Sequence, residues 1–104
     1  MSLLDEIRTV IKARCFRKAD EEVFVLASGR RSRYYIDLKQ AMFDPPSLSL
    51  LATGILEKLR SETPFPDGAG GLTLGADPLA FSVALAAHSR GLLLKPFVVR
   101  KEPK

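Results

Sequence analysis

The sequence contains few of the residues on which many catalytic and metal sites depend. Its 104 residues include one cysteine, one histidine and no tryptophan. A single cysteine excludes an intramolecular disulfide and a cysteine-cluster metal site, which agrees with a reducing compartment. Cys15 is therefore interpreted as a small apolar side chain at the end of a helix, because a catalytic thiol needs an activating base beside it. Likewise, the lone His88 is expected to complement a helix C-terminus rather than to bind a metal.

The sequence also lacks a long hydrophobic run. No apolar stretch approaches the roughly 18 residues of a membrane-spanning helix. Acidic and basic residues interrupt every apolar stretch of residues 1–20, where a secretory signal would lie. The chain is therefore expected in the cytoplasm, without a membrane partner.

What the chain does contain is typical of one small soluble domain. Its composition is 46% apolar and 27% charged, as in ordinary globular proteins. At this size folding buries only about 60–68% of the unfolded surface, so the core is expected to be thin. The net charge of +4 favours an anionic partner and leaves phosphate esters and nucleic acid both open.

Apolar residues at helical spacing predict two helices in the first part of the chain. The first covers residues 3–15 and the second residues 47–62, after a break at the Asp44-Pro45-Pro46 segment. The stretch 63–68, which is rich in proline and glycine, predicts a boundary between an N-terminal unit, 1–66, and a second unit, 67–104.

A hairpin is predicted between these helices. Residues 22–28 and 33–39 are rich in β-branched and aromatic side chains, and Gly29 supplies a turn between them. Three arginines lie at its tip, namely Arg30, Arg31 and Arg33. They indicate either an exposed turn kept soluble by charge or part of a cover over a substrate.

A strand, a tight turn, a helix and a parallel strand are predicted after residue 70, over 71–74, 75–76, 78–90 and 97–101. Asp77 is expected to cap the helix and Gly91 to follow its end. Because the helix is apolar nearly all round, it is expected to pack deeply against a sheet.

Two features at the carboxyl end of these strands could bind an anion. The turn Gly75-Ala76-Asp77 offers backbone amides where a strand meets a helix N-terminus, although such turns also serve as plain connections and a capping carboxylate competes for the amides. The cations Arg100, Lys101 and Lys104 follow the last strand, and they indicate either a ligand site or a solvated basic tail.

Two segments, residues 26–39 and 97–104, together resemble the orotate phosphoribosyltransferase family. The resemblance implies an α/β fold in which an N-terminal helix and a β-hairpin hood precede the first strand-helix-strand unit of a type I phosphoribosyltransferase sheet. The family's later signature, an apolar strand that ends in two acids followed by a Thr/Gly-rich loop, is not found. We therefore expect a truncated chain that is inactive alone.

The resemblance also implies roles for particular residues. Positions matching Arg100, Lys101 and Lys104 hold the phosphates of 5-phosphoribosyl 1-diphosphate, with Arg100 and Lys104 reaching into a neighbouring subunit's site, and Mg²⁺ shares this task. Positions matching Tyr35 and Ile36 contact orotate, and Gly75, Ala76 and Asp77 lie beside the diphosphate. The chain departs from the family at two places. Ala27 replaces a lysine that several members carry, and residues 75–79 lack a second lysine that the family has in the diphosphate turn.

The predicted function is thus transfer of a phosphoribosyl group to orotate in pyrimidine biosynthesis, giving orotidine 5′-phosphate and pyrophosphate. The expected partners are the two substrates and either a second copy of the chain or a missing C-terminal segment. The alternative is a non-catalytic regulatory module of the same fold that binds a nucleotide or RNA. Only two tyrosines interleave with the arginines of the hairpin, so nucleic acid is not the expected partner.

Overall fold

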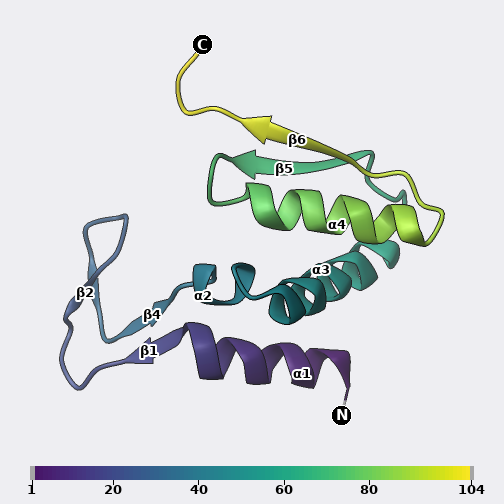
Figure 1. Ribbon diagram of the computed structural model, residues 1–104. Coiled ribbons are helices and arrows are strands. Elements are labelled where there is room, and N and C mark those ends of the chain that lie inside the picture. The colour runs from purple at the N-terminus through teal and green to yellow at the C-terminus, as the bar shows by residue number, and fades with distance from the viewer. Residues whose placement is uncertain (1, 104) are drawn as a thin grey trace.

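The computed structural model describes residues 2–103 and stacks its helices in layers beneath a pair of strands. In Figure 1 the order from one face to the other is α1, α3, α4 and then β5 with β6, while a small lobe of short strands projects to one side. The elements in chain order are α1 (Leu3–Val10), a π-helical turn (Ile11–Cys15), β1 (Phe16–Lys18), β2 (Phe24–Val25), β3 (Arg31–Ser32), β4 (Tyr34–Ile36), α2 (Lys39–Met42), α3 (Pro45–Arg60), β5 (Gly68–Leu72), α4 (Asp77–Ser89) and β6 (Lys95–Val99).

The predicted first helix is confirmed, with a change of pitch near its end. The Ser2 hydroxyl accepts a hydrogen bond from the Asp5 amide at 3.2 Å and caps α1. The last five residues of the predicted span, Ile11–Cys15, form the π-helical turn. Cys15 is 1% exposed and packs with Ala41 and Leu51, so it is the core side chain that was expected.

The hood, residues 16–36, contains two antiparallel pairs rather than the single hairpin predicted. The tip is as expected, since Val25 pairs with Arg31 and Gly29 turns the chain at φ +85°. The second predicted strand is divided, however, because Tyr34–Ile36 pairs with Phe16–Lys18 and not with residues 22–28. Residues 37–39 leave the ladder, and Lys39 begins a short helix that was not predicted.

The second helix begins two residues earlier than predicted, at Pro45. Asp44 is its N-cap, and its carboxylate accepts hydrogen bonds from the Ser47 amide and hydroxyl at 3.2 and 2.5 Å. Proline is well suited to the first helical turn because the amide it lacks would have no helical partner there. The two prolines therefore begin this helix rather than separating it from what precedes.

The parallel strand pair is confirmed, although both strands lie earlier in the sequence than predicted. β5 covers Gly68–Leu72 instead of 71–74, and β6 covers Lys95–Val99 instead of 97–101, with Gly70 opposite Phe97. The sequence GAGGL has low strand propensity. A Cβ on Gly70 would lie 2.5 Å from a ring carbon of Phe97, so the close approach of the two strands requires glycine.

Helix α4 is less deeply buried than its sequence predicts. Val83 and Ala87 pack with Ala52 and Leu56 of α3 and with Leu94 in the main core, whereas Leu85 is 71% exposed. Gly91 follows the helix at φ +74°, as predicted, and the Leu92 amide donates to the Ala87 carbonyl at 2.9 Å in a Schellman motif. Within residues 2–103, none of the helices is long and apolar enough to cross a membrane.

Candidate functional site

Two chain segments meet at the carboxyl edge of the parallel strand pair. Leu72 lies opposite Val99 in the register, and the next residue, Thr73, donates its amide hydrogen to the Val99 carbonyl at 2.9 Å. The turn 73–76 and the basic segment that starts at Arg100 therefore leave the same edge of the sheet, the turn toward α4 and the basic segment away from it (Figure 1). In open α/β sheets this edge is where ligands bind.

The turn presents part of its backbone to solvent. The amides of Ala76 and Asp77 donate to the carbonyls of Leu72 and Leu74, both at 3.1 Å. Within residues 2–103 the amides of Leu74 and Gly75 have no backbone or side-chain acceptor. A Cβ on Gly75 would meet nothing within 4 Å, so there is open space against this part of the turn.

Asp77 does not cap α4 as predicted. The helix already includes Asp77, Ala76 occupies the cap position without a side-chain bond, and the Asp77 carboxylate accepts the Thr73 hydroxyl at 2.5 Å. Its second oxygen is buried and has no hydrogen-bond partner within the described chain. The carboxylate therefore connects the turn to the helix and leaves the amides of Leu74 and Gly75 without an acceptor in the described chain.

The cations that follow β6 are exposed. Neither Arg100 nor Lys101 forms an ion pair within residues 2–103. Lys104, the third predicted member of the cluster, lies outside the described residues. Two positive charges without an ion-pair partner in the described chain thus follow β6 at the same edge of the sheet as the open turn, and such charges attract a multiply charged anion.

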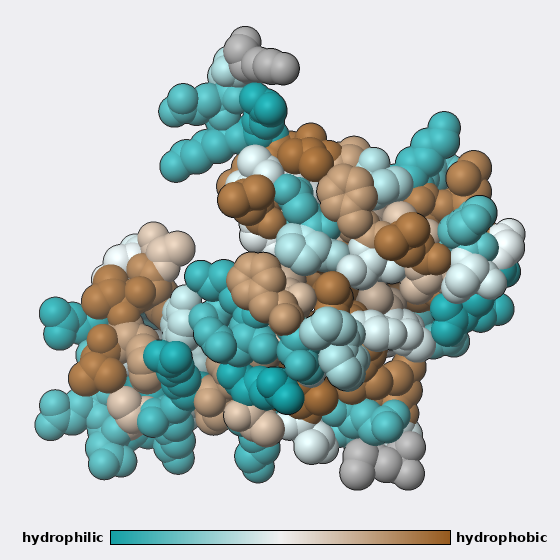
Figure 2. All heavy atoms as spheres, in the orientation of Figure 1, coloured by the Kyte–Doolittle hydropathy of each residue, from teal (hydrophilic) through white to brown (hydrophobic). Residues whose placement is uncertain are grey.

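The predicted orotate contacts lie in the hood. Tyr35 stacks on Phe24 with ring centroids 5.7 Å apart, and both Tyr35 and Ile36 are partly exposed on β4, at 38% and 56%. In Figure 1 the hood and the carboxyl edge of the strands lie on the same side of the molecule, and Figure 2 shows the surface hollowed between the hood and the C-terminal tail. The arginines at the hairpin tip are exposed, and Ala27 is exposed as well.

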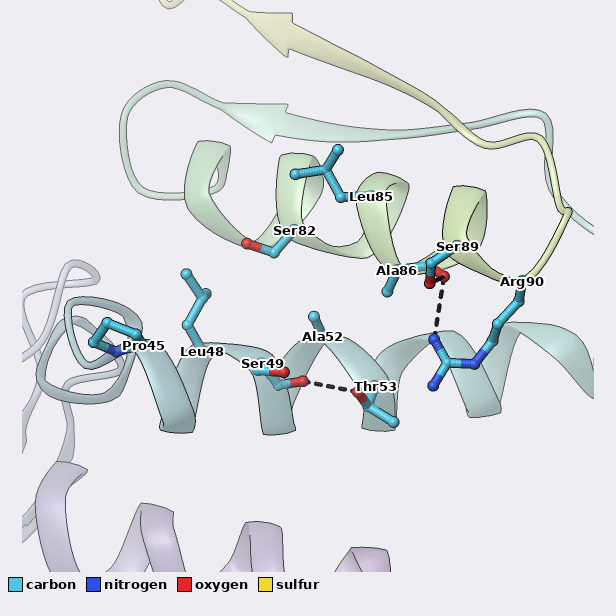
Figure 3. Close-up of a pocket in the computed structure, with 10 residues that line it drawn as sticks. All are labelled: Pro45, Leu48, Ser49, Ala52, Thr53, Ser82, Leu85, Ala86, Ser89 and Arg90. Carbon is cyan, nitrogen blue, oxygen red and sulfur yellow. Dashed lines mark hydrogen bonds between the residues drawn. The ribbon is translucent and has the colours of Figure 1, made fainter.

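A separate cavity of about 430 Å³ lies between α3 and α4 (Figure 3). Its one charged lining residue is Arg90, whose guanidinium donates to the Ala86 carbonyl at 3.1 Å. The hydroxyls of Thr53 and Ser89 donate to carbonyls of their own helices. The cavity therefore has no acid–base pair, and the candidate chemistry remains at the strand edge.

Sequence reasoning missed the partner of the predicted substrate strand and the residue that orders the turn. Phe16-Arg17-Lys18 is too short and too charged to indicate a strand by itself. The Thr73 to Asp77 hydrogen bond could have been suspected from the spacing of a hydroxyl and a carboxylate around a tight turn.

The chain is similar in sequence to orotate phosphoribosyltransferases. It is 47% identical over 100 residues to the enzyme of Aquifex aeolicus, a match that covers 96% of this chain and 54% of that protein. It is 41% identical over 85 residues to that of Leptospira biflexa. No protein-family model matches. The chain spans about half the length of the curated relatives it matches.

Solved structures show the same relation. A phosphoribosyltransferase from Corynebacterium diphtheriae superposes with a TM-score of 0.73 at 30% identity, over 100% of this chain and 54% of that one. The orotate phosphoribosyltransferase of Mycobacterium tuberculosis, in complex with 5-phospho-α-D-ribosyl 1-diphosphate, gives 0.68 at 29% identity over 96% of this chain and 54% of that one. The resemblance and the α/β fold class predicted from the sequence are thus confirmed.

Proposed function

We propose that this chain, which is similar to the N-terminal half of orotate phosphoribosyltransferases, forms part of an active site for that reaction. Orotate and 5-phosphoribosyl 1-diphosphate would give orotidine 5′-phosphate and pyrophosphate. One observation supports the proposal: the parallel pairing of β5 with β6 puts the turn that contains Gly75 and the segment that starts at Arg100 at the same edge of the sheet. It does so in a chain that is 47% identical to one such enzyme over 100 residues.

Arg100 and Lys101 would stabilise the departing pyrophosphate. As the bond to the anomeric carbon breaks, negative charge grows on the leaving group and the ribose becomes oxocarbenium-like. Cations that are already in place lower the energy of that state without reorganising. The exposed side chains of both residues are available for this role because neither is paired within the described chain. Lys104 would add a third charge.

The turn would hold the diphosphate through its backbone. The free amides of Leu74 and Gly75 are donors, and the open space at Gly75 lets phosphate oxygens approach the backbone. Asp77 does not cover these two amides, because one carboxylate oxygen accepts the Thr73 hydroxyl and the other has no partner within residues 2–103. On the hood, Tyr35 and Ile36 would give orotate an apolar and aromatic surface.

Mg²⁺ would enter with the substrate. Within residues 2–103, no three histidine, cysteine or acidic side chains are grouped closely enough to hold a metal ion. Oxygen ligands of Mg²⁺ commonly come from substrate phosphates. The residues present therefore fit an ion that arrives with the diphosphate. There it would neutralise part of the negative charge of the diphosphate, together with Arg100 and Lys101.

The chain should also associate, either with a second copy or with a C-terminal segment like that of its relatives. Leu85 and Leu93 are more than 70% exposed, and β6 exposes Phe97, Val98 and Val99 at 43–49% along an edge strand. Exposed apolar surface and unpaired strand edges are usually covered in native proteins. Without a partner, residues 1–104 should either give a mass above 11.4 kDa in light scattering or fail to unfold cooperatively. A monodisperse monomer that unfolds cooperatively would contradict this expectation.

Fusion to the remainder of the Aquifex aeolicus relative tests the proposed function. The fusion should release pyrophosphate in an orotate-dependent manner, whereas residues 1–104 alone should not exceed a control without protein, because positioning requires groups from both halves. The same fusion carrying both Arg100→Ala and Lys101→Ala is the matched control. A folded fusion without activity would favour the non-catalytic binding module, and turnover by residues 1–104 alone would contradict the need for a second half.

A further inference from the structure

A second candidate ligand site lies where α1 passes through the π-helical turn into β1, outside the strand edge described above. Arg8, Ile11, Lys12 and Phe16 line an open pocket of about 320 Å³. Arg8 comes from α1, Ile11 and Lys12 from the π-helical turn, and Phe16 from β1. The volume is at the lower end of the range for small-molecule sites.

The pocket combines an apolar floor with a cationic rim. Ile11 is half-buried and Phe16 is 38% exposed, so both offer apolar surface. Long basic side chains commonly cover apolar surface with their stems and keep the charge in water. Within residues 2–103, neither Arg8 nor Lys12 takes part in an ion pair. Both charges are therefore available to a ligand.

Aromatic and basic groups continue from this pocket onto the hood. The ring of Phe16 stacks with that of Tyr34, with centroids 6.0 Å apart and planes at 21°. The Arg33 guanidinium lies 5.8 Å from the centre of the Tyr34 ring, and Lys18 pairs with Tyr34 across the strands. The hydrogen bond and charge of Arg33, and the charge of Lys18, lower the pKa of Tyr34.

We propose that this surface, which we call the α1–β1 platform, binds a planar aromatic ring with an anionic substituent, the chemistry of a nucleoside monophosphate. The ring would stack on Phe16 and contact Ile11, and the anion would lie between Arg8 and Lys12. Base–aromatic stacking is tolerant of base identity, and a charge-assisted contact to phosphate is among the stronger polar interactions. Charge complementarity favours this occupant over an uncharged one.

A titration of ¹⁵N-labelled residues 1–104 with adenosine 5′-monophosphate tests the proposal. A purine is chosen because the proposed transfer reaction uses a pyrimidine, so the two sites are probed separately. Saturating shifts are expected at Ile11, Lys12, Phe16 and Tyr34. Adenosine and inorganic phosphate should each bind at least about tenfold more weakly, because each keeps only one of the two contacts.

Charge variants provide the matched comparison. Lys12→Glu should weaken binding about tenfold or more, and Arg8→Gln should act in the same direction. Lys58→Glu is the control, since Lys58 is also an exposed lysine in the last turn of a helix and lies outside the platform. Circular dichroism checks that each variant is folded.

Three results would overturn the proposal. They are shifts confined to residues 73–76 and 100–101, equal affinities for Lys12→Glu and Lys58→Glu, and equal binding of an acidic peptide that has no aromatic ring. The last result would make the platform a docking surface for an acidic protein segment. None of them depends on pyrophosphate release, so failure here leaves the proposed transferase function to its own test.

Discussion

Replacing Gly70 with alanine should separate the two strands that build the candidate site. Gly70 lies opposite Phe97 in the parallel register. A methyl group on Gly70 would lie 2.5 and 2.6 Å from two ring carbons of Phe97 and would also overlap the Phe97 carbonyl oxygen. Carbon atoms pack at about 3.5–4.0 Å. The ring can rotate away, but the carbonyl oxygen can move only if the strands separate.

The overlap sets the size of the effect. Inserting a methyl group into a packed region typically costs about 1–3 kcal/mol. Each kcal/mol lowers the Tm of a domain of this size by about 4–8 °C, so Gly70→Ala should lower it by about 4–24 °C. Gly75→Ala is the control, because its Cβ would meet nothing within 4 Å. Its free energy of unfolding should stay within about 0.5 kcal/mol of the wild type.

Thermal unfolding followed by circular dichroism measures both variants. The same comparison in a Phe97→Ala background separates the two sources of overlap, since removing the ring leaves the Phe97 carbonyl in place. Gly70→Ala should therefore remain destabilising there. Equal midpoints for Gly70→Ala and Gly75→Ala would refute the argument that glycine is required by the close approach of β5 and β6.

Two further predictions concern charge. In the active fusion, Arg100→Ala and Lys101→Ala should each raise the KM for 5-phosphoribosyl 1-diphosphate about 10- to 150-fold, from about 1.5–3 kcal/mol per contact, and hardly change that for orotate. Lys95→Ala, at the other end of β6, is the control, and unchanged kinetics in both variants would make the cluster a solvated tail. The hydrogen bond from the Ser47 hydroxyl, with help from the Ser47 amide and Arg14, holds the pKa of Asp44 below its ordinary value. This stabilisation is present above the ordinary carboxyl pKa and is lost as pH falls through the lowered one, so Asp44→Ala and wild type should converge in stability only below about pH 4; a constant difference down to pH 2 would contradict it.

The sequence predicted the elements whose ends carry strong local signals. The break predicted at Asp44-Pro45-Pro46 and the stop predicted at Gly91 lie within about two residues of the observed helix ends, because such signals act through contacts only a few residues away. The parallel pairing also followed from local order, since a strand-helix-strand unit of this length returns to the same sheet.

The errors occurred where contacts between distant residues decide the structure. The pairing of Tyr34–Ile36 with Phe16–Lys18 depends on where α1 ends and how the hood folds back, and neither leaves a local pattern. The exposure of Leu85 likewise depends on which faces of α4 the other elements cover. For the candidate site, the sequence predicted that Gly75 and Arg100 each follow a strand of the parallel pair. It did not predict the hydrogen bond between the Thr73 hydroxyl and the Asp77 carboxylate.

The glycines of β5 connect strand formation with the chemistry proposed for the strand edge. In isolation they weaken the strand, and for that reason the sequence placed it three residues too late. In the folded chain the lack of a side chain at Gly70 admits the ring and carbonyl of Phe97. This contact fixes the register in which Leu72 meets Val99 and in which Thr73 bonds to the Val99 carbonyl. A shift of one residue in that register would move Arg100 by about 3.3 Å along the sheet relative to Gly75. A displacement of that size is enough to break a hydrogen bond to a phosphate oxygen. Selection for the proposed anion site would therefore act on Gly70, although glycine has no side chain that could touch a ligand.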